Sequence, residues 1–126
     1  MKSKLSLILR LVLGLIMLVF GLNKFFDFLP PMEGLPDKAT AFFGALIATG
    51  YMIKLIAISE IIGGLLLIIG KWIPFALVFL TPVILNIFFF HMFLDLSQNM
   101  ILALVVTVIH IMLLYKYKNS FTALFS

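Results

Sequence analysis

The sequence predicts an all-α integral membrane protein, a four-helix bundle with an interfacial or re-entrant helix between its first and second spans. The chain is 64% hydrophobic and only 11% charged, whereas about a quarter of the residues in soluble domains are charged. Its apolar residues fall in runs of about 16–22, close to the length that crosses a bilayer as a helix. A chain of 126 residues suits one transmembrane domain, residues 1–126.

Each predicted helix has boundary signals in the sequence. Spans are expected at 5–22, 52–70, 73–94 and 100–115, and the interfacial helix at 37–49. Pro30, Pro31 and Pro36 interrupt any helix in the connection after the first span. Asp37 can cap the helix that follows, which is too short and too polar at its start to cross the membrane.

The distribution of lysines predicts the orientation, because basic residues accumulate on the cytoplasmic side. Four spans place both termini on one side, and that side carries lysines at positions 2, 4, 71, 116 and 118. The lysines expected on the other side are accompanied by four acidic residues. We therefore expect a multi-pass protein with both termini in the cytoplasm.

Several chemistries are excluded or disfavoured by the sequence. The chain has no cysteine, which excludes thiol–disulfide chemistry and cysteine-ligated iron–sulfur clusters. Its net charge of +4 is not gathered into a basic cluster, so no nucleic-acid partner is expected. No metal-ligand spacing is present. A haem is disfavoured because His91 and His110 are separated by about 20 Å in depth.

Glu60 is the residue around which the other helices are expected to pack. It lies inside the apolar run from Met52 to Gly70, where a carboxylate costs about 2.5–3.5 kcal/mol on insertion scales. Such a group must be paired, protonated or placed in a wet cavity. Gly63 and Gly64 follow at three and four residues, where they allow another helix to approach closely.

Arg10 and Asn86 are the expected partners of Glu60. Arg10 shares a stripe of the first span with Gly14 and Gly21, and its estimated depth differs from that of Glu60 by about 7–8 Å. Asn86 is near enough in depth to hydrogen-bond Glu60, so the three could form one polar seam. In the alternative interpretation, Arg10 extends to the inner membrane surface and Glu60 and Asn86 only hold helices together.

Three further polar residues are candidates for the pocket. His91 lies near the outer edge of the third span, and Lys24 lies at the end of the first. Either could instead be an ordinary interfacial residue. His110 lies in the fourth span, where a buried histidine that packs and hydrogen-bonds is the alternative to a ligand-binding role.

Five short motifs, in this order and spacing, resemble those of the DoxX-like membrane proteins. They are Arg10-x-x-x-Gly14-Leu15, Phe20-Gly21-Leu22-Asn23-Lys24-Phe25, Ala48-Thr49-Gly50-Tyr51, Glu60-x-x-Gly63-Gly64 with Leu67 and Gly70, and Asn86-x-x-x-x-His91. The resemblance implies a four-helix membrane bundle in which Arg10, Lys24, Glu60 and His91 match the polar motif positions of the family. It also implies roles such as membrane subunit of a thiosulfate:quinone oxidoreductase or helper in methylamine dehydrogenase maturation.

By this resemblance, the first functional hypothesis is a bacterial inner-membrane protein that acts as a membrane subunit or anchor of a redox or maturation complex, more a non-catalytic subunit than a stand-alone enzyme. Its polar pocket around Glu60 would take a quinone or another lipid-like molecule, with membrane lipid and a protein partner or second copy around it. A small proton-coupled transporter is the second hypothesis, although small multidrug exporters carry their carboxylate in the first helix, where this chain has Arg10. The third is an assembly factor whose polar residues are purely structural.

Overall fold

The all-α prediction is confirmed by a computed structural model, which describes residues 3–28, 36–94 and 100–125. The helices are α1 (Ser3–Phe26), α2 (Asp37–Ala48), α3 (Met52–Ile69), α4 (Ile73–Leu94), α5 (Met100–Lys116) and the 3₁₀ helix η1 (Lys118–Phe125). The largest departure from the predicted bounds is at the end of α1, which continues four residues beyond the expected Leu22.

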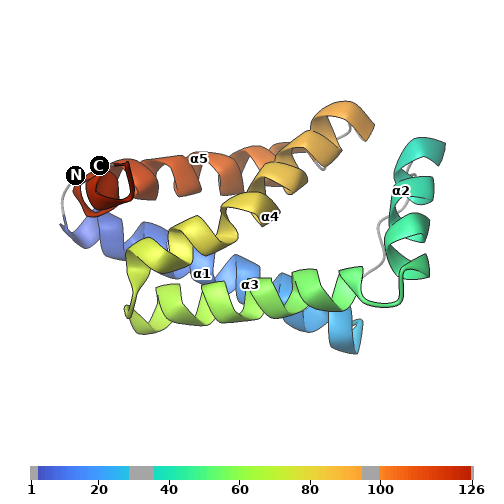
Figure 1. Cartoon of the computed structure of the whole chain (residues 1–126), viewed down its shortest axis with the longest axis horizontal. Coiled ribbons are helices and arrows are strands. Elements are labelled where there is room, and N and C mark those ends of the chain that lie inside the picture. The colour runs from blue at the N-terminus through green and yellow to red at the C-terminus, as the bar shows by residue number, and fades with distance from the viewer. Residues whose placement is uncertain (1–2, 29–35, 95–99, 126) are drawn as a thin grey trace.

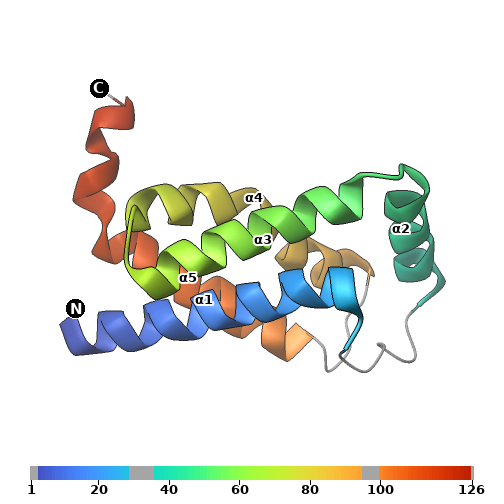
Figure 2. The ribbon, with the colours of Figure 1, turned by 90° about the horizontal axis from the view of Figure 1, so that it is seen from below.

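Helices α1, α3 and α5 run along the long axis of the molecule, and α4 runs obliquely to them (Figure 1). The short helix α2 lies across one end of this bundle, and both chain termini lie at the other end (Figures 1 and 2). We call the end that carries α2 the α2 end, and the opposite one the terminal end.

Three of the described helices, α1, α3 and α4, are long and apolar enough to cross a membrane. The apolar helix α5 is shorter, with 17 residues. The long helices expose many large apolar side chains, such as Leu15 on α1, Ile58 on α3 and Val108 on α5. Apolar surface of this kind on every long helix is expected where lipid, rather than water, surrounds a bundle.

The closest packing in the bundle joins α1 to α3. A Cβ atom added to Gly14 would lie 2.8 Å from the carbonyl oxygen of Gly64, and one added to Gly64 would lie 2.7 Å from that of Gly14. Gly21 approaches the carbonyl oxygen of Ala57 just as closely, with a Cβ distance of 2.8 Å. The two backbones are therefore in direct contact at two levels, which is possible only where side chains are absent or very small.

These contacts fix the antiparallel register of α1 and α3. Gly21 meets Ala57 near the α2 end, Gly14 meets Gly64 at mid-height, and Arg10 lies against Gly70 near the terminal end. Gly70 ends α3 in the left-handed conformation, with φ 87°, and its N–H donates to the carbonyl oxygen of Leu66. This is the usual glycine cap of a helix C-terminus.

Helices α3 and α4 also touch closely, at Gly63, where the contact is with a side chain and not with backbone. A Cβ atom on Gly63 would lie 2.5 Å from Cγ of Leu80. Gly63 and Gly64, which the sequence placed together on the face of Glu60, thus serve two neighbours: Gly63 faces α4 and Gly64 faces α1. Leu80 and its fully buried neighbours Leu77 and Leu67 form the core at the terminal half of the bundle.

We predict that Gly14→Ala destabilises the protein in detergent by about 1–3 kcal/mol, because the new methyl group collides with the backbone of α3. The matched control is Gly44→Ala, at a helical position with nothing within 4 Å of an added Cβ. That change should be neutral or stabilising by up to about 1 kcal/mol, as expected from helix propensity. Thermal unfolding of the two purified variants measures the difference, and equal melting temperatures would contradict the close contact.

Candidate functional site

Glu60 forms an ion pair with Lys24. The Nζ atom of Lys24 lies 2.6 Å from Oε1 of Glu60 and donates a hydrogen bond to it. The Glu60 side chain is only 1% exposed, whereas that of Lys24 is 26% exposed. The cation and the hydrogen bond offset part of the cost of removing this carboxylate from water.

Helix geometry explains why Lys24 reaches Glu60. The Cα–Cβ bonds of a helix tilt toward its N-terminus, so Lys24 leans toward Gly21 and Glu60 leans toward Ala57. Because Gly21 packs against Ala57, both side chains lean toward the same level of the bundle. The continuation of α1 to Phe26 keeps Lys24 helical and therefore on the face toward α3.

The expected pair of Arg10 with Glu60 is not formed. The guanidinium of Arg10 lies at the end of α3, with Nη2 3.2 Å from where a Cβ of Gly70 would be. Ten residues of helix separate Gly70 from Glu60, a rise of about 15 Å. Arg10 also leans toward the N-terminus of α1 and thus away from Glu60. The depth estimate failed because it ignored these opposite directions, and the prediction of Arg10 as the partner of Glu60 is wrong.

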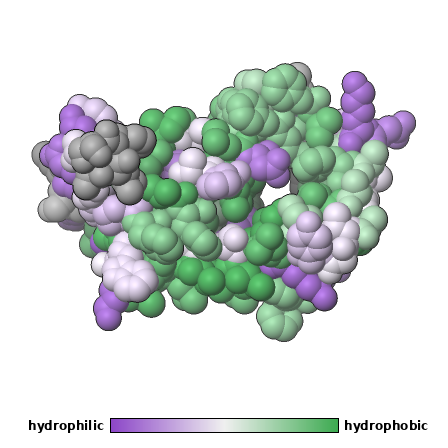
Figure 3. Space-filling model, viewed as in Figure 1, coloured by the Kyte–Doolittle hydropathy of each residue, from purple (hydrophilic) through white to green (hydrophobic). Residues whose placement is uncertain are grey.

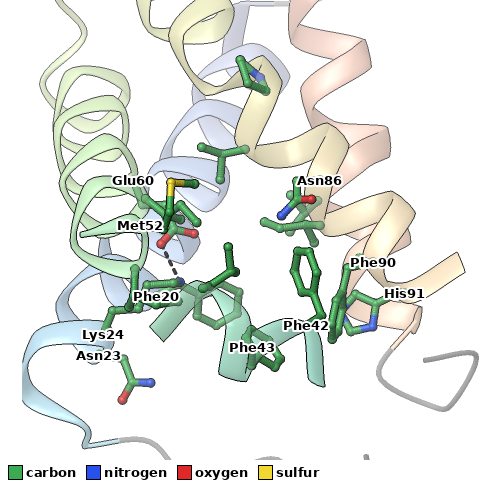
Figure 4. Close-up of a pocket in the computed structure, with 18 of the residues that line it drawn as sticks. Phe20, Asn23, Lys24, Phe42, Phe43, Met52, Glu60, Asn86, Phe90 and His91 are labelled. Carbon is green, nitrogen blue, oxygen red and sulfur yellow. Dashed lines mark hydrogen bonds and ion pairs between the residues drawn. The ribbon is translucent and has the colours of Figure 1, made fainter. Parts of the chain in front are cut away.

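A cavity of about 830 Å³ lies next to the ion pair and is lined by all of the α-helices (Figure 4). Its wall is mostly apolar, with five polar residues in it. The lining residues are Phe20, Asn23, Lys24, Phe42, Phe43, Leu46, Met52, Ile53, Ile56, Glu60, Pro82, Val83, Asn86, Ile87, Phe90, His91, Leu102, Ala103 and Val106. This volume and this mixture of surfaces are typical of pockets for small organic ligands.

Four of the five polar residues of the cavity wall form two opposing sets. Lys24 and Glu60 lie on the side of α1 and α3, and Asn86 and His91 lie on the side of α4 (Figure 4). Asn86 faces Glu60 across the cavity (Figure 4), and the hydrogen bond predicted between these two residues is not formed. A molecule between the two sets could therefore contact an ion pair on one side and an amide and an imidazole on the other.

Phenylalanine side chains close the α2 end of the cavity. Phe42 and Phe43 of α2 lie with their ring centroids 5.6 and 4.9 Å from that of Phe90 on α4. Phe90 is 6% exposed, and it also contacts the ring of His91 edge-on at 5.1 Å. This closure was not predicted from the sequence, because α2 and α4 meet only in the folded chain. The available signal was the apolar face of α2, on which Phe42, Phe43 and Leu46 recur at helical spacing.

His110 lies outside this cavity and joins two helices. Its Nε2 atom is 2.9 Å from the carbonyl oxygen of Leu77 and 3.3 Å from Oγ1 of Thr81, both on α4. The side chain is 4% exposed. Among the residues that the structure describes, Arg10 and His110 are the two predicted site residues that do not line the cavity. His110 has instead the packing and hydrogen-bonding role that was its alternative interpretation.

We predict that Lys24→Met and Glu60→Gln are coupled, because each leaves the other half of a buried pair without its partner. Each single change should cost about 3–5 kcal/mol of stability in detergent. The double variant should be less damaged than the sum, by about 0.5–3 kcal/mol. The matched comparison replaces Lys24→Met by Arg10→Met, whose effect should simply add to that of Glu60→Gln. If the effects of Lys24→Met and Glu60→Gln were additive, and those of Arg10→Met and Glu60→Gln were coupled, Arg10 and not Lys24 would be the partner of Glu60.

Comparison with known proteins supports the resemblance seen in the motifs. The sequence model of the DoxX family matches residues 5–92, a segment that contains most of α1, all of α2 and α3, most of α4 and every polar residue of the cavity wall. Neither the curated proteins nor the solved structures include a match to the chain. The match covers well over half of the sequence and agrees with the apolar helices. The chain therefore belongs to the DoxX family and is a multi-pass membrane protein.

Proposed function

We propose that the protein is a membrane subunit or anchor of a redox or maturation complex in a bacterial inner membrane. It would hold a lipid-like small molecule, with a quinone as the first candidate, in the cavity beside Glu60. The observation that carries this proposal is the buried ion pair of Lys24 and Glu60, exposed on one side to a largely apolar cavity. Membership of the DoxX family makes the quinone the first molecule to test.

In this proposal α5 is the fourth span. Its 17 residues rise about 26 Å, near the lower limit for crossing the hydrocarbon core. One side of α5 is buried, including Ala103, Val106 and Leu113, and the other exposes apolar residues such as Ile101 and Ile111. A helix with one side in a bundle and the other apolar suits a position between protein and lipid.

The proposal places α2 at the membrane surface. This helix has 12 residues, too few to span, and it lies across the bundle rather than along it (Figure 2). Its Phe42 and Phe43 point toward the cavity (Figure 4), while Lys38 is exposed. Apolar residues on one face and polar residues on the other are typical of helices that lie in the interface.

The cavity is suited to a head group that forms hydrogen bonds and carries no net charge. Lys24 and Glu60 neutralise one another, so an added ion would have no uncompensated partner in an apolar surrounding. The oxygen atoms of a quinone could accept hydrogen bonds from Lys24 and from Asn86 on the opposing wall. In this role Lys24, Glu60, Asn86 and His91 bind and orient the ligand, and electron transfer belongs to a partner protein.

We predict that the purified protein binds a decyl-chain quinone and that Asn86→Leu weakens this binding about tenfold, through loss of a hydrogen bond in an apolar site. Glu60→Gln should weaken it as well. The control is Ser59→Ala, because the Ser59 hydroxyl bonds the carbonyl oxygen of Leu55 within its own helix. Tritium-labelled quinone measures the affinity in proteoliposomes. Undetectable binding to the wild type would contradict the quinone. Loss of folded protein in every polar variant would favour a purely structural role.

The orientation predicts the location of two reporters. A fusion at Ser126 should report the cytoplasm, because the terminal end carries exposed Lys4, Lys71 and Lys116. A reporter inserted after Gly50, in the α2–α3 turn at the opposite end, should report the outside. Alkaline phosphatase and green fluorescent protein distinguish the two compartments. The reverse pattern would mean that lysine distribution does not orient this chain.

A further inference from the structure

Beyond Leu80 and Gly63, α3 and α4 separate. Gly63 packs on Leu80, so the next positions on the same face of α3 are Ile56 and Ile53, and on α4 they are Val83 and Ile87. In two helices that stayed together, these side chains would pack against each other. Instead all four line the cavity, which means that the cavity extends between α3 and α4 in the half of the bundle near the α2 end.

Pro82 lies where the two helices part. Proline inside a helix removes one backbone hydrogen bond and displaces the preceding turn, which bends the helix. Pro82 and Asn86 both line the cavity, yet they are exposed at the molecular surface. The cavity therefore reaches the side of the bundle here. Figure 3 shows a gap through the space-filling surface between α2 and the rest of the bundle.

This side opening lies among helices that are candidate membrane spans. Both α3 and α4 belong to that class. Ile56 lies four residues, a rise of about 6 Å, beyond Met52, the first residue of α3. Apart from Asn86, the side chains that frame the opening are apolar, whereas the α2 end is covered by Phe42, Phe43 and Phe90. If α3 and α4 cross the membrane as proposed above, the opening faces hydrocarbon and the covered end faces the aqueous side.

We infer that ligands reach the cavity sideways from the bilayer, through a lateral portal formed by Ile53, Ile56, Val83 and Ile87. The ligand class is an amphiphile with a small uncharged head and a long apolar tail. The head lies between the Lys24–Glu60 pair and Asn86, and the tail leaves through the portal into the surrounding lipid. A cavity of 830 Å³ then needs to enclose only the head and the first part of the tail. This inference rests on the proposed ligand-binding function.

The test uses two photoreactive fatty alcohols in proteoliposomes, one with a diazirine next to the hydroxyl group and one with it mid-chain. In the wild type the first should label residues near Lys24, Glu60 and Asn86, and the second should label the portal residues. Peptide mass spectrometry locates each label. Mid-chain labelling of Phe42 and Leu46 would place the tail at the α2 end, and labelling of Leu102 would place it between α1 and α5. Either result overturns the portal.

A portal variant gives the second measurement. Ile56→Trp combined with Val83→Trp narrows the opening and should reduce labelling by both alcohols about tenfold. Ile58→Trp is the control, because Ile58 is 47% exposed on α3 and is not part of the described cavity wall. Circular dichroism and gel filtration establish that each variant is folded. Unchanged labelling in the folded portal variant overturns the portal alone. No labelling of the cavity in the wild type overturns the lipid-like ligand and the portal together.

Discussion

The direct backbone contact between α1 and α3 is the constraint on which the rest of the structure depends. Gly14 on Gly64 and Gly21 on Ala57 leave no room for a side chain, and in lipid such contacts are a main source of helix association. They also fix the register, because two contacts at different levels allow only one alignment. The ion pair follows from that register, since Lys24 and Glu60 lean toward the level at which Gly21 meets Ala57.

The remaining helices complete a site that α1 and α3 begin. Gly63 holds α4 tightly at Leu80, and the bend expected at Pro82 then lets α4 move away. His110 holds α5 to α4 through the carbonyl oxygen of Leu77, at the terminal side of that proline. The terminal half of the bundle is therefore packed, and the half next to α2 is hollow. The cavity has its polar groups where the hollow half begins.

Much of this architecture could be predicted from the sequence, because apolar runs, prolines and glycines specify helices locally. Glu60 was identifiable for the same reason, as a carboxylate inside an apolar run. Its partner Lys24 was not identifiable, because depth along the membrane does not say in which direction a side chain leans. Arg10 and Lys24 lie on the same face of α1, but Arg10 leans away from Glu60 and Lys24 leans toward it. The role of Phe42 and Phe90 was also hidden, since two segments far apart in sequence must meet to close the cavity.

The most direct test of the account is the ionisation of Glu60 in the wild type and in two variants. Infrared spectroscopy in lipid distinguishes an ionised carboxylate from a protonated carboxyl group by its C=O stretch, and Glu60→Gln identifies the band. The account predicts an ionised Glu60 in the wild type and in Arg10→Met. It predicts a protonated Glu60 in Lys24→Met, where the paired cation is gone. An ionised Glu60 that depends on Arg10, or a protonated one in the wild type, would contradict it.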